Sequence, residues 1–370
     1  WTPSALRHSR LEVAELRVAA LTIDTLGPST PGPTPLPDDL TLPLAVSIGQ
    51  LTLDSLIVDG GTPITDIAAR LTSGGQHHTI DALALRAGDV SVGGKIALDG
   101  RAPFAVRADA EIRGEVEQRP MVLTVEAGGT LARLDLSAQA RQGVDGQLRT
   151  VLTPFAEMPF HTADIDLRDV DPSAWAAGAP RARLDIKAQL QAADEDDKSA
   201  EKQSAIASLT ARLHLVNHTP GPIDKQHLPL TSLKLRVQPA GEIAGADTAL
   251  QLDDIALELS GGGALRGHGR WSGKALTLNL AARRLDAARL ATHLIPTRFN
   301  GPLELSADAE RQHVRLDWAD TRGRLKADVQ HAGDTVTIKA LELSAGDARL
   351  EASGRVELSG KQDFAVQGAL

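Results

Sequence analysis

The segment FAVRADAEI, residues 104–112, shows the pattern from which the fold of this 370-residue chain can be predicted. Apolar residues occupy positions 104, 106, 108, 110 and 112, and the positions between them are mostly charged. Successive side chains of a β-strand point to opposite faces, so this spacing gives one apolar and one polar face. Strands of a buried parallel sheet are apolar on both faces, so the pattern favours antiparallel strands.

The same alternation recurs along almost the whole chain. Glycine-rich turns such as residues 59–61 and 73–75 separate alternating segments of about five to eight residues at roughly ten-residue spacing, which is typical of an antiparallel β-protein. We expect the apolar residues of these segments to line one face, and the predicted lining residues are Leu83, Leu85, Ile96, Leu98, Phe104, Val106, Leu134, Leu136, Leu184, Ile186, Leu233, Leu235, Leu257, Leu259, Leu276, Leu278, Leu303, Leu305, Leu341, Leu343, Val356 and Leu358.

Composition divides the chain into five predicted parts. Five prolines between positions 28 and 37 mark an extended linker, and the run DEDDKSAEK predicts a solvated, mobile loop. Two short helices are expected, because each begins near an aspartate and is followed by a proline. The predicted parts are first strands at 1–26, the linker at 27–43, β-repeats at 44–191 with a helix at 171–177, the charged loop at 192–204, and β-repeats at 205–370 with a helix at 285–294.

Internal repeats indicate how the strands are organised. The sequence LALRAGD at residues 83–89 recurs as LELSAGD at 341–347, and each copy leads into a related segment, GKIALDG at 94–100 or GRVELSG at 354–360. Recurrence of ordered elements predicts a quasi-one-dimensional array in which each unit packs only against its neighbours.

Composition and motifs argue against an enzyme. The net charge is −9 without a basic cluster, cysteine is absent, and aromatic residues make up 2%, so nucleic-acid binding and thiolate metal sites are not expected. The histidine pairs His77/His78 and His214/His218 have no acidic partner at ligand spacing, so we predict no metal site. We find no phosphate loop, nucleophile elbow or paired catalytic carboxylates, and predict no cofactor.

The aliphatic face is the remaining functional feature. An open, curved sheet would expose it as a trough suited to lipid acyl chains, because exposed apolar surface on that scale normally binds a ligand or partner. A sandwich or closed barrel would instead seal the face, which leaves a structural β-repeat spacer as the main alternative. An adhesin-type solenoid is a weaker alternative, since asparagine, which often forms ladders inside such solenoids, occurs at only three positions.

Several segments resemble the TamB family, whose AsmA-like relatives share much of the pattern. These are WTPSAL at residues 1–6, LPLAVSI at 42–48, PFAVRADA at 103–110 and VDPSAW at 170–175. The resemblance implies a periplasmic half-pipe or "β-taco" sheet in a Gram-negative bacterium. It also implies a role in phospholipid transport to the outer membrane or in assembly of outer-membrane proteins, with an Omp85-type barrel as partner. The chain begins at Trp1 and has no apolar run long enough to cross a bilayer, so we expect a segment of a longer protein whose inner-membrane anchor and barrel-docking domain lie elsewhere.

Overall fold

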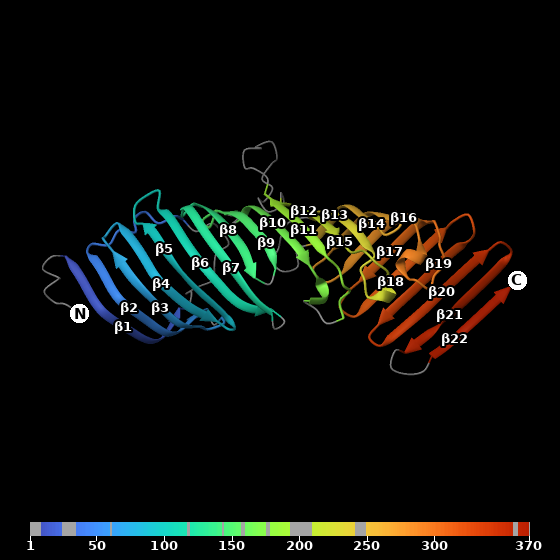
Figure 1. Ribbon diagram of the computed structural model, residues 1–370, viewed down its shortest axis with the longest axis horizontal. Helices are drawn as coiled ribbons and strands as arrows, with labels where there is room; N and C mark the ends of the chain where they lie inside the picture. The colour runs from blue at the N-terminus through green and yellow to red at the C-terminus, as the bar shows by residue number, and fades with distance from the viewer. Residues whose placement is uncertain are drawn as a thin grey trace. The chain divides into compact units, whose positions relative to one another are not determined.

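The computed structural model describes residues 9–23, 35–59, 61–116, 119–142, 144–156, 160–174, 178–192, 209–240 and 249–357, and the backbone of 362–369. The chain divides into two compact units, Trp1–Asp169 and Val170–Leu370, which are described separately. Both are built almost entirely of strands, so the predicted all-β fold class is confirmed (Figure 1).

Unit 1 is an open sheet in which consecutive strands pair side by side. In the described residues, no pairing joins its first strand to its last. The strands are β1 (Arg10–Ile23), β2 (Ala45–Val58), β3 (Ile64–Ser73), β4 (His77–Ala87), β5 (Val90–Asp99), β6 (Ala105–Val116), β7 (Arg119–Thr130), β8 (Arg133–Gln142), β9 (Asp145–Leu152) and β10 (Phe160–Val170).

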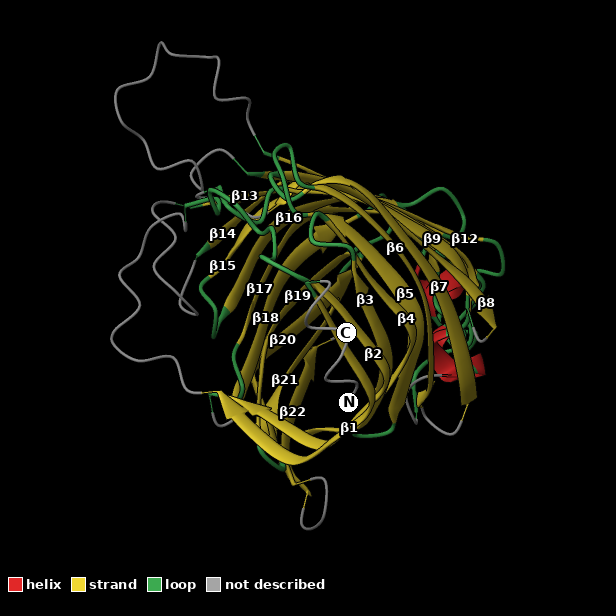
Figure 2. Ribbon diagram, turned by 90° about the vertical axis from the view of Figure 1, so that its left-hand side faces the viewer, coloured by secondary structure: helices red, strands yellow, loops and turns green. Residues whose placement is uncertain are grey.

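Unit 2 repeats this arrangement with antiparallel pairing throughout. Its strands are β11 (Leu184–Gln191), β12 (Thr210–Asn217), β13 (Leu230–Pro239), β14 (Leu250–Leu259), β15 (Ala264–Trp271), β16 (Leu276–Leu285), β17 (Phe299–Ala307), β18 (Arg311–Ala319), β19 (Arg324–Ala332), β20 (Thr335–Ala345), β21 (Ala348–Glu357) and β22 (Gln362–Ala369). The strands of each unit bend along their length, so each sheet is curved (Figure 2).

The pairing of β1 with β2 departs from the predicted antiparallel order, because these two strands run parallel. Val13 lies opposite Ile48, and Leu16 lies opposite Leu51. Both strands carry apolar residues at the same offsets, so a parallel register brings each leucine, valine and isoleucine of β1 beside a branched apolar residue of β2. The connection that permits this pairing contains the predicted linker, of which residues 27–34 lie outside the described residues.

The described end of that linker runs along the strand ends of unit 1. The Leu40 N–H donates to the Gly100 carbonyl at 2.9 Å, and the Leu42 N–H donates to the Gly75 carbonyl at 2.8 Å. These bonds join the segment to the turn between β3 and β4 and to the connection after β5.

Strict alternation is wrong at several strand centres, where the structure contains β-bulges. On β4, the register shifts between Ile80 and Leu83, and on β14 it shifts between Leu252 and Ile255. Each bulge inserts one residue and thereby returns the following apolar side chain to the same face. The strands therefore continue through breaks in alternation and reach 8 to 14 residues, so most of them are longer than predicted.

Both expected helices are shorter than predicted. The first is a 3-10 helix, η2 (Pro172–Ala174), and the rest of the predicted range, residues 175–177, lies outside the described residues. The second is α1 (Ala287–Leu290), because Leu285 still belongs to β16 and Asp286 is the N-cap, accepting from the Ala288 N–H. A further 3-10 helix, η4 (Ile223–Lys225), was not predicted. Most of the predicted charged loop, from residue 193 on, lies outside the described residues.

Unit 2 has a small buried cluster where α1 meets the sheet. Ala282, Leu285 and Phe299 form its centre, and Leu290 of α1 packs against them. Trp318 also joins the cluster, with its ring centroid 6.2 Å from that of Phe299. This contact covers the apolar side of the sheet at one end of β16 and β17.

Candidate functional site: the apolar faces of the two sheets

The predicted lining residues of unit 1 share one face of its sheet. Cross-strand partners lie on the same side of a sheet, so the register fixes their facing. Leu98 pairs with Val106, which pairs with Gly129, which in turn pairs with Leu134. In the next row, Ile96 pairs with Ala108 of β6. Ala108 pairs with Ala127 of β7, which pairs with Leu136.

The bulge on β4 brings Leu83 and Leu85 to this face as well, opposite Gly94 and Val92 of β5. The face also contains residues that were not predicted, including Leu16 and Leu51 of the parallel pair. An apolar spacing of two then three residues along β1 and β2 would have identified them.

Unit 2 likewise gathers its described lining residues on one face. Leu278 pairs with Leu305, and Leu257 pairs with Leu233. The remaining members of this face follow from the register of consecutive strands and are Leu184, Ile186, Leu235, Leu259, Leu276, Leu303, Leu341, Leu343 and Val356. Leu358 lies outside the described residues.

Phe104 is the exception among the predicted residues. It precedes β6, has φ of +57°, and is buried in the connection from β5. Its N–H donates to the Arg101 carbonyl at 2.7 Å, and its carbonyl accepts from the Leu131 N–H at 3.0 Å. Phe104 therefore closes the end of the sheet and is not a strand residue.

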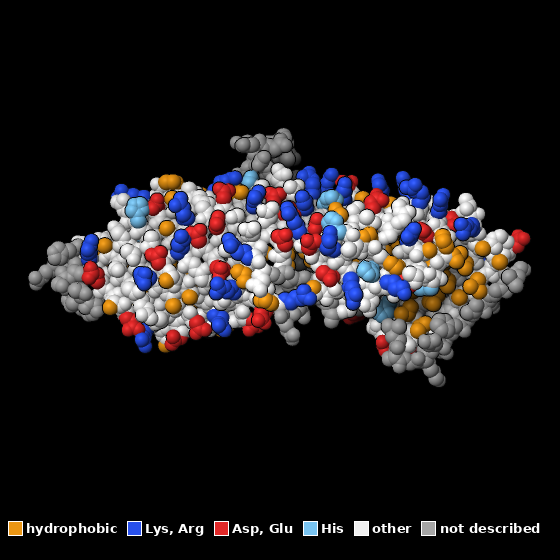
Figure 3. Space-filling view, viewed as in Figure 1, with side chains coloured by type: hydrophobic (Ala, Val, Ile, Leu, Met, Phe, Trp, Pro, Cys, Tyr) orange, Lys and Arg blue, Asp and Glu red, His pale blue; other side chains and the backbone are white. Residues whose placement is uncertain are grey.

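The apolar faces are largely uncovered within the described residues. Of the predicted lining residues that the structure describes, only Phe104 and Leu184 are buried, and the others keep part of their surface accessible. Leu343 of β20 remains 43% exposed and Leu350 of β21 remains 39% exposed. Apolar side chains are visible over β19–β21 of unit 2, whereas the visible face of unit 1 is dotted with charges (Figure 3). The cluster around Leu285 is the main region of unit 2 where this face is buried.

The opposite faces are polar and held by cross-strand ion pairs. In unit 2, Arg324 lies 2.5 Å from Asp317, and Arg315 lies 3.3 Å from Asp328. Hydrogen bonding to His313 and then to Arg315 lowers the pKa of the Asp328 carboxyl below its ordinary value. These contacts pair opposite charges across neighbouring strands, and the polar side chains that make them lie on the face opposite the apolar one.

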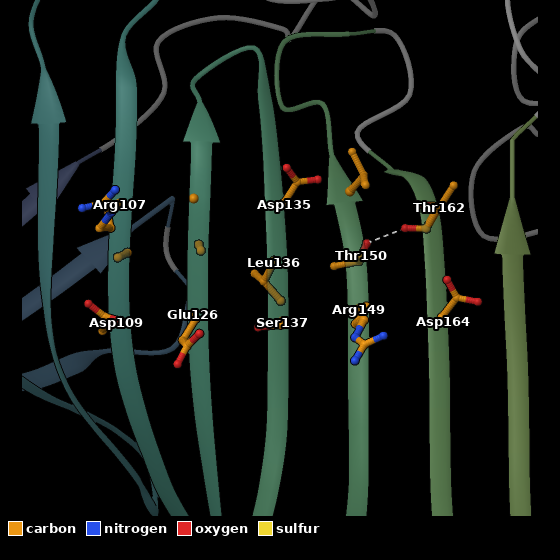
Figure 4. Close-up of a pocket in the computed structure, with 14 residues that line it drawn as sticks. Arg107, Asp109, Glu126, Asp135, Leu136, Ser137, Arg149, Thr150, Thr162 and Asp164 are labelled. Atoms are coloured by element: carbon orange, nitrogen blue, oxygen red, sulfur yellow. Dashed lines mark hydrogen bonds between the residues drawn. The ribbon is translucent and has the colours of Figure 1, made fainter.

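A hollow of about 560 Å³ lies over the polar face of β6–β10 (Figure 4). Its walls carry both signs of charge, with Arg107 and Arg149 near Asp109 and Glu126. The Thr150 hydroxyl donates to the Thr162 carbonyl at 2.7 Å. The hydrogen bond of this hydroxyl thus joins it to a backbone carbonyl and not to a general base.

The described residues contain no group of three or more histidine, aspartate or glutamate side chains arranged to hold a metal ion. None of the helices in the described ranges is long and apolar enough to cross a membrane. In the described residues, each sheet thus offers two candidate binding surfaces, an aliphatic face and the charged face opposite it.

Comparison with known families agrees with this architecture. Residues 23–167, which run from the end of β1 to β10, match the family model of the TamB N-terminal domain. This part of the chain is similar to the N-terminal domain of TamB proteins. No curated protein and no solved structure matches the chain. TamB proteins are non-catalytic transport or assembly components of the periplasm and the cell envelope.

The TamB match coincides with unit 1 and includes its predicted lining residues from Leu83 to Leu136. The segments at residues 1–6 and 170–175, which also resemble TamB, lie outside the matched range. Unit 2 has the same curved, one-sided sheet as the TamB part.

Proposed function

We propose that the apolar faces bind hydrocarbon chains and that the protein forms part of a hydrophobic conduit in the periplasm. The observation that supports this proposal is the aliphatic face of each unit, whose described residues are mostly only partly buried, as at Leu278 opposite Leu305. Aliphatic walls suit phospholipid acyl chains, which need apolar contact and no directed hydrogen bonds. Within the proposal, phospholipid moves along these faces between the inner and outer membranes.

Support of outer-membrane protein assembly, including that of autotransporters, belongs to the same proposal. A client β-strand has one apolar face whose side chains resemble an acyl chain in surface chemistry. Anchoring in the inner membrane of a Gram-negative bacterium and contact with an Omp85-type barrel are assigned to no residue of this sequence. Both are expectations that come with the similarity to TamB proteins.

Site-specific photo-crosslinking in cells tests the proposal at two neighbouring positions. Leu278 lies on the apolar face of β16, whereas Thr277 faces the other side, opposite Arg270. A photoreactive amino acid at position 278 is expected to give lipid adducts in mass spectra, and the same group at 277 is not. In unit 1, Leu136 and Ser137 form an equivalent pair on β8.

The outcomes separate the alternatives. Adducts with protein fragments at position 278 would favour client assembly over lipid transport. Absence of adducts at both apolar positions in stably folded protein, together with a purified sample that yields no extractable lipid, would favour a structural spacer with a sealed face.

A further inference from the structure

A cationic hollow of about 450 Å³ lies on the polar face of unit 2, over β11–β14. Its basic lining residues are Lys187, Arg212, His214, Lys234 and Arg236. Figure 3 shows lysine and arginine side chains gathered over this part of the molecule. This hollow lies on the sheet face opposite the proposed acyl-chain surface, because Arg212 and Lys234 alternate with Leu213 and Leu235 along their strands.

The strand register brings two arginines and two further basic side chains directly opposite each other. Arg212 of β12 lies opposite Arg236 of β13, and His214 lies opposite Lys234. Like charges directly opposite each other on neighbouring strands destabilise a sheet. A sequence selected for stability alone would be expected to avoid this arrangement.

Other regions of the same polar face contain ion pairs between opposite charges on neighbouring strands. Arg324 pairs across strands with Asp317, Lys326 with Glu342, and Arg266 with Glu258. Arg212, His214 and Lys234 form no ion pair within the described ranges of the chain. The hollow thus gathers two strongly basic side chains, Arg212 and Lys234, that form no ion pair within the described residues.

Nearby acids compensate only part of this charge. Asp254 lies 2.8 Å from Arg236 Nη2, and Asp253 accepts from the Gln251 amide at 2.9 Å. Arg236 Nε is buried and has no hydrogen-bond partner among the described residues. The guanidinium of Arg236 is thus only partly satisfied by the acids beside it.

We propose that this hollow is a binding site for a compact phosphate-bearing anion. Arginine side chains present planar, forked donors that match phosphate oxygens, and two facing arginines with a lysine can surround such a group. The lining contains no aromatic side chain on which a nucleobase could stack, so a nucleic acid does not fit. The phosphate belongs either to a free anion or to the headgroup of an anionic lipid at a membrane surface.

The first experiment measures binding of inorganic pyrophosphate to the intact chain by calorimetry, at constant ionic strength. The intact chain is needed because acidic residues 194–197 lie between β11 and β12 in sequence and outside the described residues. We expect saturable binding that Arg212→Gln weakens by about tenfold or more, as loss of a charge-assisted donor pair implies. Arg315→Gln is the matched control, because Arg315 already pairs with Asp328 and Glu304.

A second variant separates binding from folding. Arg212→Glu places an opposite charge across from Arg236, so it should abolish binding while leaving the unliganded protein at least as resistant to heat. A fall in thermal resistance with unchanged pyrophosphate affinity would overturn the proposal. Equal loss of affinity in Arg212→Gln and Arg315→Gln would overturn it as well.

Vesicle binding then identifies the source of the phosphate. Binding to phosphatidylglycerol vesicles but not to phosphatidylcholine vesicles, lost in Arg212→Gln, would assign the site to a lipid headgroup. Pyrophosphate binding without vesicle binding would assign it to a free anion. Binding of neither probe would refute the site and would leave the proposed conduit untouched.

Discussion

Ile80 and Leu83 lie on the same face of β4 although they are three positions apart, because a β-bulge separates them. Ala82 within the bulge has φ of +51°, a left-handed conformation that favours glycine. The same device preserves the apolar face at other strand centres, including that of Leu252 and Ile255. Continuity of the aliphatic surface thus depends on backbone irregularities as much as on alternation.

Ala82→Gly is expected to stabilise β4 locally. Glycine adopts the left-handed conformation without the penalty of a β-carbon, so the free energy of local opening should rise by about 0.5–1 kcal/mol. Native-state hydrogen exchange of the β4 amides measures the change. Ala84→Gly is the control, since Ala84 is also exposed but does not have a positive φ, so glycine there should destabilise by a similar amount.

Leu285→Ala should lower the free energy of unfolding far more than Leu343→Ala does. Leu285 is 2% exposed within the cluster of Phe299 and Leu290, and its truncation leaves a cavity that should cost about 2–5 kcal/mol. Leu343 lies on the uncovered face and is 43% exposed, so the same change should cost about 1 kcal/mol. Denaturant unfolding followed by tryptophan fluorescence compares the two variants. Equal losses would indicate that the apolar face is covered in solution.

Lowering the pH should reduce the folding stability of unit 2, in part through protonation of Asp328. Hydrogen bonds from His313 and Arg315 lower the pKa of Asp328, so the folded state favours the ionised carboxylate. The resulting stability is present above the ordinary aspartate pKa of about 3.9 and is lost as pH falls through the lower folded-state pKa. Asp328→Asn should therefore flatten the acid limb of a thermal-stability profile. An unchanged acid limb in this variant would show that the ion-pair network does not contribute.

Alternation was sufficient to predict the facing of residues such as Leu98, Val106 and Leu278, because every second residue of a regular strand lies on one side. It could not predict the bulge at Ala82, since a single extra residue leaves only a three-residue apolar spacing in the sequence. The 3-10 helix η4 was missed because three residues are too few to show helical periodicity.

Cross-strand partners were the least predictable feature. The parallel register of Val13 with Ile48 depends on strands joined by a long linker, so no local turn indicates it. The facing of Arg212 and Arg236 likewise follows from the register of β12 and β13, which are separated by a connection that contains η4. Pairing of strand residues is set by tertiary structure, and composition alone suggested that no basic cluster existed.

Asn217→Ala should strongly destabilise the end of β12. The side chain is 3% exposed, and its amide donates to the carbonyls of Leu228 at 3.1 Å and Leu230 at 2.9 Å. Its carbonyl accepts from the N–H groups of Arg183 at 3.3 Å and Thr219 at 3.0 Å. Truncation leaves these buried backbone groups without their partner, at a cost of about 2–4 kcal/mol in the free energy of unfolding.

Two further variants determine whether hydrogen bonding causes the Asn217 effect. Asn279→Ala removes an exposed asparagine from β16 and should change stability by less than about 0.5 kcal/mol. Asn217→Asp keeps the acceptor but points a carboxylate at two carbonyls, which should raise the pKa of the new carboxyl group. Relative to the parent protein, this variant should therefore lose stability as pH rises above about 4, where the unfolded state ionises. Denaturant unfolding at pH 4 and 7 measures that difference, and a pH-independent loss would mean that side-chain shape, not hydrogen bonding, makes Asn217 important.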